Sequence, residues 1–342
     1  MLKTSDFDFD LPNELIAQKP IVNRDEAKML VIDKNDSSLV DKKFYNIVDY
    51  LEAGDCLVLN DSKVLPARLI GIKVSTKAVV EILLLNRGDG DNWKCLVKPA
   101  KRIKLNDIIS FGNDILQAKC IAIGEEGIRE FSFKYNGVFY EILDQLGEMP
   151  LPPYIKQKIT NHEDYQTVYA KNIGSVAAPT AGLHFTDELL TRIRKKGVNI
   201  VFITLHVGLG TFRPVSSNYI DDHHMHSEYY EISSRSASTI NDTRRNKKKI
   251  IAVGTTVVRT LETVGKTNNE IKATSGWTNI FIKPGYQFKV VDAIITNFHL
   301  PKSTLLMLVS TFSGIDTIRD AYHYAIKNNY KFFSFGDCTF LK

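Results

Sequence analysis

The chain has few cysteines, and they are not arranged for a metal site or a disulfide framework. Its 342 residues include only Cys56, Cys95, Cys120 and Cys338. No two of them form a C-x-x-C pair, and no histidine lies near enough to complete a zinc knuckle. Widely spaced single cysteines are typical of reduced, structural thiols in a cytosolic protein.

The sequence also lacks a membrane-spanning run. No apolar stretch approaches the roughly 18 residues that a spanning helix needs. The first residues, M-L-K-T-S-D-F-D-F-D, are acidic where a secretory signal would be basic. We therefore expect a cytoplasmic protein that makes no membrane contact.

Two nucleotide-binding fingerprints are missing, and so is a strong net charge. Neither a P-loop nor a G-x-G-x-x-G segment occurs, which argues against a standard NTPase or a Rossmann oxidoreductase. Lys and Arg number 44 against 39 Asp and Glu, a formal charge of +5. So mild an excess permits contact with nucleic acid without demonstrating it.

Strand and helix patterns alternate near both chain ends. At about 150 residues per domain, the length predicts roughly two domains. The early segments 29–33 and 56–60 have the pattern of buried strands, and 44–51 has helical apolar spacing. Later segments alternate in this order: a helix from Thr186, strands at 199–206 and 249–254, a helix from Thr256, a strand at 290–296 and a helix from Ser303. Such alternation predicts an α/β sheet.

The middle of the chain has a different texture. From residue 64 to 135, short apolar runs alternate with turn clusters, which predicts a small antiparallel β-barrel or sandwich. A helical stretch at 138–147 follows, and then the stiff proline cluster M-P-L-P-P-Y-I. We predict an α/β domain formed by residues 1–63 and 148–342, with a β-barrel domain, residues 64–147, inserted into it.

Four polar, mostly glycine-containing loops suggest a composite site. They are G-S-V-A-A-P-T-A-G-L-H-F-T from Gly174, L-H-V-G-L-G-T-F-R-P from Leu205, A-V-G-T-T-V-V-R-T-L-E from Ala252 and T-N-F-H-L-P-K-S-T-L from Thr296. In open α/β sheets, ligands bind beyond the carboxyl ends of strands, beside helix amino termini. Three of the four loops have that placement, so their side chains could converge on one ligand.

The loop residues also have structural explanations. His184 precedes a helix that Thr186 caps, and capping explains that helix without any function. His206 ends a strand, where a core histidine bonded to a backbone carbonyl is the alternative to a functional one. Arg259 and Glu262 have the spacing of an ordinary surface ion pair.

The clearest rival signal is D-D-H-H-M-H-S-E-Y-Y, from Asp221. His224, His226 and Glu228 alternate and would face one side of a strand, as metal ligands can. The zincin helical spacing is absent, so a strand lining a polar pocket is favoured over a metal-dependent hydrolase. Two basic segments, residues 244–249 and an expected hairpin at 98–104, are either phosphate contacts or solvated faces.

Taken together, the motifs resemble those of the tRNA-modifying S-adenosylmethionine ribosyltransferase-isomerases of queuosine biosynthesis. The matching segments, in order, are F-D-F-D-L-P-N-E-L-I-A, V-L-N-D-S-K-V-L-P-A-R-L, M-P-L-P-P-Y-I, Y-Q-T-V-Y-A, A-P-T-A-G-L-H-F, H-V-G-L-G-T-F, M-H-S-E, V-G-T-T-V-V-R-T-L-E and T-N-F-H-L-P-K-S-T-L-L-M-L-V. The family usually ends in G-D-A-M and an aliphatic residue, whereas this chain ends in G-D-C-T-F-L-K.

The resemblance implies an activity. S-adenosylmethionine (AdoMet) would donate its ribosyl group to the aminomethyl group of 7-aminomethyl-7-deazaguanine at the wobble position of tRNA. Rearrangement would give epoxyqueuosine-tRNA, with adenine and methionine released. The family also implies an α/β domain with a β-barrel domain, a monomer, and no metal. A non-catalytic RNA-binding protein remains the other rival.

The chemistry assigns expected roles. A base must remove a proton from the ribosyl carbon beside the sulfonium, an acid must assist the departing adenine, and the attacking amine must be neutral. The expected catalytic residues are His184, His206, His299, Arg213 and Glu228. The expected AdoMet contacts are Thr255, Thr256, Arg259, Asn297, Phe298 and Lys302, with Phe212 as another candidate wall. The expected tRNA clamp consists of Lys98, Lys101, Arg102 and Lys104.

Overall fold

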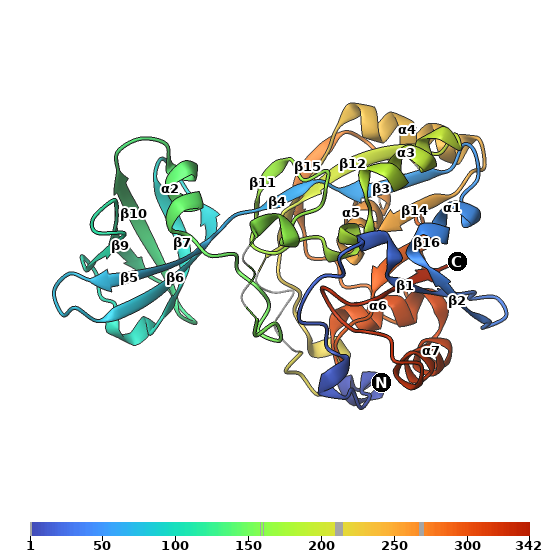
Figure 1. The fold of residues 1–342 in the computed structure, drawn as a ribbon, viewed down its shortest axis with the longest axis horizontal. Helices are drawn as coiled ribbons and strands as arrows, with labels where there is room; N and C mark the ends of the chain where they lie inside the picture. Colours follow the sequence, from blue (N-terminus) through green and yellow to red (C-terminus); the bar gives the residue numbers. More distant parts are fainter. Residues whose placement is uncertain (1, 158, 160, 209–214, 267–269) are drawn as a thin grey trace.

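The chain folds into an α/β body and a barrel that stands apart from it (Figure 1). The computed structural model describes residues 2–157, 159, 161–208, 215–266 and 270–342. The predicted fold class, an α/β sheet built from both chain ends with an inserted antiparallel β-barrel, is confirmed.

The α/β body is organised around one sheet of nine strands. From edge to edge the strands are β15 (Thr274–Thr278), β13 (Glu228–Ile232), β12 (Asn199–Leu205), β3 (Cys56–Asn60), β14 (Ile250–Val253), β16 (Ala293–Asn297), β17 (Cys338–Leu341), β1 (Lys28–Ile32) and β2 (Leu39–Lys43). The central strands β12, β3, β14 and β16 are mutually parallel. Their carboxyl ends therefore meet at one edge of the sheet.

Helices cover both faces of this sheet. They are α1 (Ile47–Tyr50), α3 (Asp187–Lys195), α4 (Ser234–Arg245), α5 (Thr255–Gly265), α6 (Thr304–Ser313) and α7 (Ile315–Lys327). Alternate residues of β3 enter different clusters: Val58 packs with one core and Leu57 with the other. Burial on both faces explains why the central strands read as continuous apolar runs. Within the described ranges, no helix is long and apolar enough to cross a membrane.

The predicted helical segment at 44–51 is confirmed, with a change of helix type along it. A 3-10 helix at Phe44–Asn46 continues directly into α1, Ile47–Tyr50. Phe44, Ile47 and Leu51 are all buried. These few turns already bury the apolar face, and Leu51 returns to an extended conformation. The helical segment thus ends within one residue of the predicted end.

The inserted domain is a closed barrel of six strands. They are β5 (Arg68–Lys73), β6 (Val79–Arg87), β7 (Asn92–Lys98), β8 (Ile108–Phe111), β9 (Leu116–Ile123) and β10 (Ile128–Tyr135), followed by α2 (Phe139–Leu146). The expected hairpin at 98–104 was wrong, because β7 pairs with β6 and β10 whereas β8 pairs with β5 and β9. Residues 98–104 instead connect two strands that are not neighbours.

We propose domain boundaries near residues 64 and 148. β4 (Ser62–Val64) pairs with β11 (Asn172–Ser175) outside the barrel, and Val64 packs with Met149. The next residue, Leu65, already belongs to the barrel core. Val64 and Leu65 are adjacent in the chain but pack in different hydrophobic cores. This supports a first domain boundary within a residue or two of residue 64.

A buried carboxylate on α5 ties that helix to the chain that enters β16. Glu262 has no exposed surface, and its oxygens accept hydrogen bonds from the Tyr286 hydroxyl and from the backbone N–H groups of residues 289–291, at 2.9–3.0 Å. The carboxylate also raises the pKa of Tyr286, although burial is the larger cause. The expected surface pair of Arg259 and Glu262 was therefore wrong, because both are buried with separate partners.

We predict that Glu262→Gln lowers the free energy of unfolding by about 2–4 kcal/mol, since an amide cannot accept four hydrogen bonds as a carboxylate does. Denaturant unfolding followed by circular dichroism measures the change. The matched control is Glu141→Gln, at an exposed glutamate of α2. Equal stability of the two variants would contradict the role given to Glu262.

Candidate functional site

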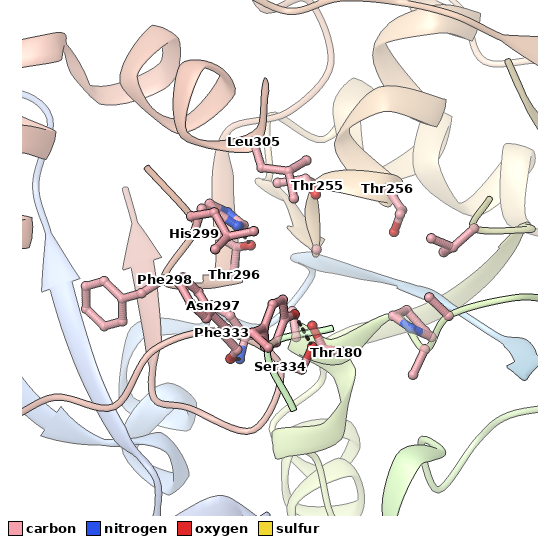
Figure 2. A pocket seen from close by; sticks show the side chains of 18 residues that line it. Thr180, Thr255, Thr256, Thr296, Asn297, Phe298, His299, Leu305, Phe333 and Ser334 are labelled. Carbon is pink, nitrogen blue, oxygen red and sulfur yellow. Dashed lines mark hydrogen bonds between the residues drawn. The ribbon is translucent and has the colours of Figure 1, made fainter. Parts of the chain in front are cut away.

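Cavity 1 lies at the carboxyl edge of β14 and β16 and encloses about 90 Å³. Figure 2 shows the side chains around it. They come from Tyr154, residues 177–181, Val207, residues 254–256, residues 296–300, Leu305, Phe333 and Ser334. All four predicted loops contribute lining residues. The loop from Leu205 contributes one described residue, Val207. Cavity 1 therefore lies where open α/β sheets bind their ligands, beyond the carboxyl ends of the strands.

The amino end of α5 forms one wall of cavity 1. Gly254 follows β14 with φ of 88°, a conformation that side chains disfavour, and its N–H bonds to Ile295 O at 2.8 Å. Thr255 and Thr256 then begin the helix, whose first N–H groups have no partner within it. The Thr256 Oγ1 atom is buried and has no hydrogen-bond partner in the described part of the chain. This end of the helix therefore offers unpaired donors and a positive dipole end.

Asn297 ends β16 on the opposite side of the cavity. Its Nδ2 donates to Phe333 O at 3.0 Å and lies 3.3 Å from His184 Nε2. These contacts orient the amide and leave Oδ1 buried without a partner among the described residues. Thr256 and Asn297 thus bring two unsatisfied buried oxygens to one cavity. Such atoms are costly unless a ligand or water satisfies them.

The structure separates the predicted histidines. His184 does not line cavity 1. It packs against Phe44, with ring centroids 5.1 Å apart. Burial lowers the pKa of His184 to about 4, so the ring is neutral at pH 7. The Asn297 amide donates to it, which makes His184 a support for Asn297 more than an acid or base.

His299 is the histidine that lines cavity 1. Its Nε2 lies 3.2 Å from Thr296 Oγ1, and its backbone N–H donates to the Tyr322 hydroxyl at 2.9 Å. Burial lowers the pKa of His299 to about 3. At neutral pH the imidazole is therefore uncharged, and burial makes it a weaker base than a free histidine.

Two predicted AdoMet contacts have other packing partners, although Phe298 is also among the residues that line cavity 1. The Phe298 ring is fully buried and packs against Phe332, 4.8 Å between centroids; in Figure 2 it points away from Thr255 and Thr256. The Lys302 ammonium pairs with Asp8 at 2.6 Å and does not line cavity 1.

The aromatic wall comes from residues that sequence reasoning missed. Phe333 and Tyr154 line cavity 1 with ring centroids 4.8 Å apart, and the Tyr154 hydroxyl hydrogen-bonds to Ser334 Oγ at 2.7 Å. Phe333 has φ of 71°, which is rare for an aromatic residue. The local sequence, F-F-S-F-G at residues 332–336, does not predict a positive φ at Phe333. The sequence pattern alone therefore could not identify Phe333 as a residue of the cavity wall.

Cavity 2, of about 600 Å³, lies between the barrel and the α/β body. On the barrel side its lining includes Leu65, residues 85–87, Trp93, Glu126, Ile128 and Tyr140. On the other side it includes residues 173–174, Val176, residues 206–208, residues 226–229 and Trp277. Val207 lines both cavities, so they are adjacent.

His206 belongs to cavity 2. Its ring stacks on Tyr229 at 6.1 Å and an interplanar angle of 13°, and Nδ1 is buried with no partner in the described chain. Burial lowers the pKa of His206, while Asp61 and Glu231 act in the opposite direction. A Cβ on Gly174 would lie 2.7 Å from the ring, so a glycine is needed for this close approach. Asp61, directly after β3, is a further residue that the sequence patterns did not indicate.

A buried ion pair borders cavity 2, because one of its members, Glu228, lines that cavity. Arg259 pairs with Glu228, and its guanidinium also donates to Ile280 O at 3.3 Å. The other Glu228 oxygen accepts from the Gly208 N–H at 2.9 Å. Arg259 lines neither cavity, and its contact with Glu228 connects it to cavity 2. The predicted residues Phe212 and Arg213 lie outside the described residues.

The metal-site geometry expected of a hydrolase is not formed. β13 begins at Glu228, so His224 and His226 precede the strand instead of alternating along it. Both histidines are exposed, whereas Glu228 is buried against Arg259. Across the described ranges, no three His, Cys, Asp or Glu side chains are grouped to hold a metal ion.

The basic segment 98–104 lies near the rim of cavity 2. Lys98, Lys101, Arg102 and Lys104 are all exposed. The buried Arg129 guanidinium donates to Ala100 O at 2.8 Å and to Ile128 O at 2.7 Å. Ile128 itself lines cavity 2. These bonds fix the basic segment beside the loop that borders the cavity.

Comparison with known proteins gives the family. The profile of a family described as "Queuosine biosynthesis protein" matches residues 4–341. A crystal structure of S-adenosylmethionine tRNA ribosyltransferase from Thermotoga maritima is 37% identical to this chain. The match covers 99% of this chain and 100% of that one, with a TM-score of 0.58. The chain belongs to the queuosine biosynthesis protein family.

Proposed function

We propose that this protein is an AdoMet:tRNA ribosyltransferase-isomerase. It transfers the ribosyl group of AdoMet to 7-aminomethyl-7-deazaguanine at the tRNA wobble position and releases adenine and methionine as epoxyqueuosine-tRNA forms. The observation that carries the proposal is the 37% identity, over almost the whole chain, to a protein named as such a ribosyltransferase. A monomer working in the cytoplasm completes the proposal.

Cavity 1 is the proposed AdoMet site. The free N–H groups at the start of α5 suit the carboxylate of the methionine moiety, because both the dipole and the unpaired donors favour an anion there. Thr256 Oγ1 and Asn297 Oδ1 offer a donor and an acceptor that lack partners among the described residues. With about 90 Å³, the cavity holds only part of a nucleoside-sized ligand, whose sites usually measure about 300–1,000 Å³. The rest of AdoMet would extend past Val207 toward cavity 2.

Two proton transfers are assigned to different histidines, one to His299 in cavity 1 and one to His206 in cavity 2. His299, which lines cavity 1, is the proposed base for the ribosyl carbon beside the sulfonium. Burial lowers its pKa to about 3, so this role requires the sulfonium to acidify that carbon strongly. His206, whose Nδ1 has no described partner, is placed to accept a proton from the aminomethyl group and keep that amine nucleophilic. His184 acts through Asn297, and Arg259 through Glu228.

The tRNA is proposed to lie across the barrel and the rim of cavity 2. The anticodon loop is single-stranded, so its target base can be turned out of the stack. The exposed cations of segment 98–104 would hold phosphates next to that base.

The rivals predict other behaviour. A metal-dependent hydrolase would contain stoichiometric zinc, and a non-catalytic RNA-binding protein would bind tRNA without using AdoMet. The deciding experiment incubates the protein with AdoMet and tRNA carrying the aminomethyl-deazaguanine. Equal amounts of free adenine and of nucleoside with the epoxycyclopentyl mass gain, measured by chromatography and mass spectrometry, would support the proposal. Folded protein that produces neither would overturn it.

We predict that Thr256→Val raises the KM for AdoMet at least roughly tenfold, because a hydrogen bond to a charged group is worth about 1.5–3 kcal/mol. The KM for tRNA should not change. Thr263→Val is the matched control, since Thr263 lies on the same helix and outside cavity 1. Steady-state adenine release provides both constants. An unchanged KM for AdoMet would remove Thr256 from the site.

We predict that the double variant Lys101→Glu, Arg102→Glu weakens tRNA binding and flattens its salt dependence. The slope of log K against log salt should fall by roughly 0.7 for each single-strand phosphate that the variant no longer neutralises. The control, Lys119→Glu with Lys134→Glu, makes the same charge change at exposed positions of β9 and β10. Filter binding at several salt concentrations makes the measurement. Equal effects of both pairs would show general charge attraction and no clamp.

A further inference from the structure

Aromatic side chains concentrate around cavity 2. The chain contains two tryptophans, and both Trp93 and Trp277 line this cavity. Tyr140 and Tyr229 line it as well. Cavity 1 also has an aromatic wall, from Tyr154 and Phe333, but no tryptophan lines it. The two cavities therefore differ in that only cavity 2 has indole rings among its described lining residues.

On the α/β side, the aromatic groups form a continuous series. The Trp277 ring meets the Tyr229 ring edge to face at 5.6 Å, and Tyr229 stacks on His206 at 6.1 Å. Trp277 lies on the edge strand β15, directly opposite Tyr229 of the neighbouring antiparallel strand β13. It is 60% exposed, unusual for so large an apolar side chain. An exposed indole next to an aromatic series offers a free face for stacking.

The barrel supplies the opposite wall. Trp93 is buried and packs against Phe139 at 5.6 Å, so it is a fixed part of the barrel core. Tyr140, the next residue of α2, borders the same space. The cavity is thus bounded by aromatic surface from both domains, with the cations of segment 98–104 held near its rim by Arg129.

The inner end of cavity 2 adjoins cavity 1 at Val207. That residue is held on both sides: its N–H donates to Ser175 Oγ at 2.9 Å, and its carbonyl accepts from the Val176 N–H at 3.0 Å. His206, next in the chain, also lines cavity 2, and its buried Nδ1 has no partner among the described residues. A flat group entering between the aromatic walls would meet the His206 ring close to cavity 1.

We propose that cavity 2 is the subsite for a purine-like base turned out of single-stranded RNA, with Trp277 stacking on that base or its neighbour and His206 meeting its substituent. This proposal rests on the proposed function and extends it to the second substrate. The volume of about 600 Å³ accommodates a base with its sugar and phosphate. Stacking on aromatic side chains is the usual means of holding splayed-out bases.

Binding is tested without turnover, by tryptophan emission and with no AdoMet present. The probes are an anticodon stem-loop RNA carrying the aminomethyl-deazaguanine and the same stem-loop with an abasic site at that position. The base-containing RNA is expected to change the emission, and the abasic RNA to change it much less. The change should shrink in Trp277→Phe, which keeps a stacking ring and removes the reporter. Equal responses to both RNAs would overturn the proposal.

Kinetics provide a second, independent readout. Trp277→Ala is expected to raise the KM for the stem-loop roughly tenfold, within the range measured for base–aromatic stacking, while the KM for AdoMet stays constant. Tyr45→Ala, at an exposed aromatic residue outside both cavities, is the control. A rise in the KM for AdoMet instead would assign this surface to AdoMet and overturn the proposal. Base-dependent emission in a protein that never releases adenine would reject the proposed function while supporting the base subsite.

Discussion

The parallel pairing of β12, β3, β14 and β16 is the constraint on which the rest of the structure depends. Parallel strands end at the same edge, so segments far apart in the sequence must meet there. The register sets Val253 beside Ile295, and the Gly254 N–H bonds to the Ile295 carbonyl just beyond it. The start of α5 and the amide of Asn297 consequently face one cavity. No single segment could assemble this pair of unsatisfied oxygens.

The same constraint places the barrel. The chain leaves β3 at its carboxyl end, passes through β4 and enters the barrel within a few residues. An insertion at that point must stand over the edge where the loops meet, as Figure 1 shows for β4 and β11 at the junction. The barrel is therefore one wall of the site. Cavity 2 exists because the inserted domain brings Trp93 and Tyr140 to face His206 and Trp277.

Sequence patterns predicted the segments of the site better than the side chains within them. Glycine-rich loops after buried strands mark the sheet edge reliably, because close approach and unusual φ need glycine. Side-chain direction depends on partners that the local pattern does not contain. The Phe298 ring packs into an aromatic core although the residue borders cavity 1, and Arg259 pairs with Glu228, 31 positions away in the chain. His184 and His299 occur in similar loops, yet only His299 borders a cavity.

The charge distribution favours a division of labour between the cavities. None of the described residues that line cavity 1 is charged at neutral pH, because its one histidine has its pKa lowered to about 3 by burial. A neutral imidazole does not repel the AdoMet sulfonium, and an uncharged wall avoids the cost of burying a second ion. The carboxylate of Glu228 lies in the lining of cavity 2 and is held by Arg259 and the Gly208 N–H. Because Arg259 neutralises Glu228, this pair adds no net charge beside cavity 2, and its carboxylate is held in place without attracting a second cation.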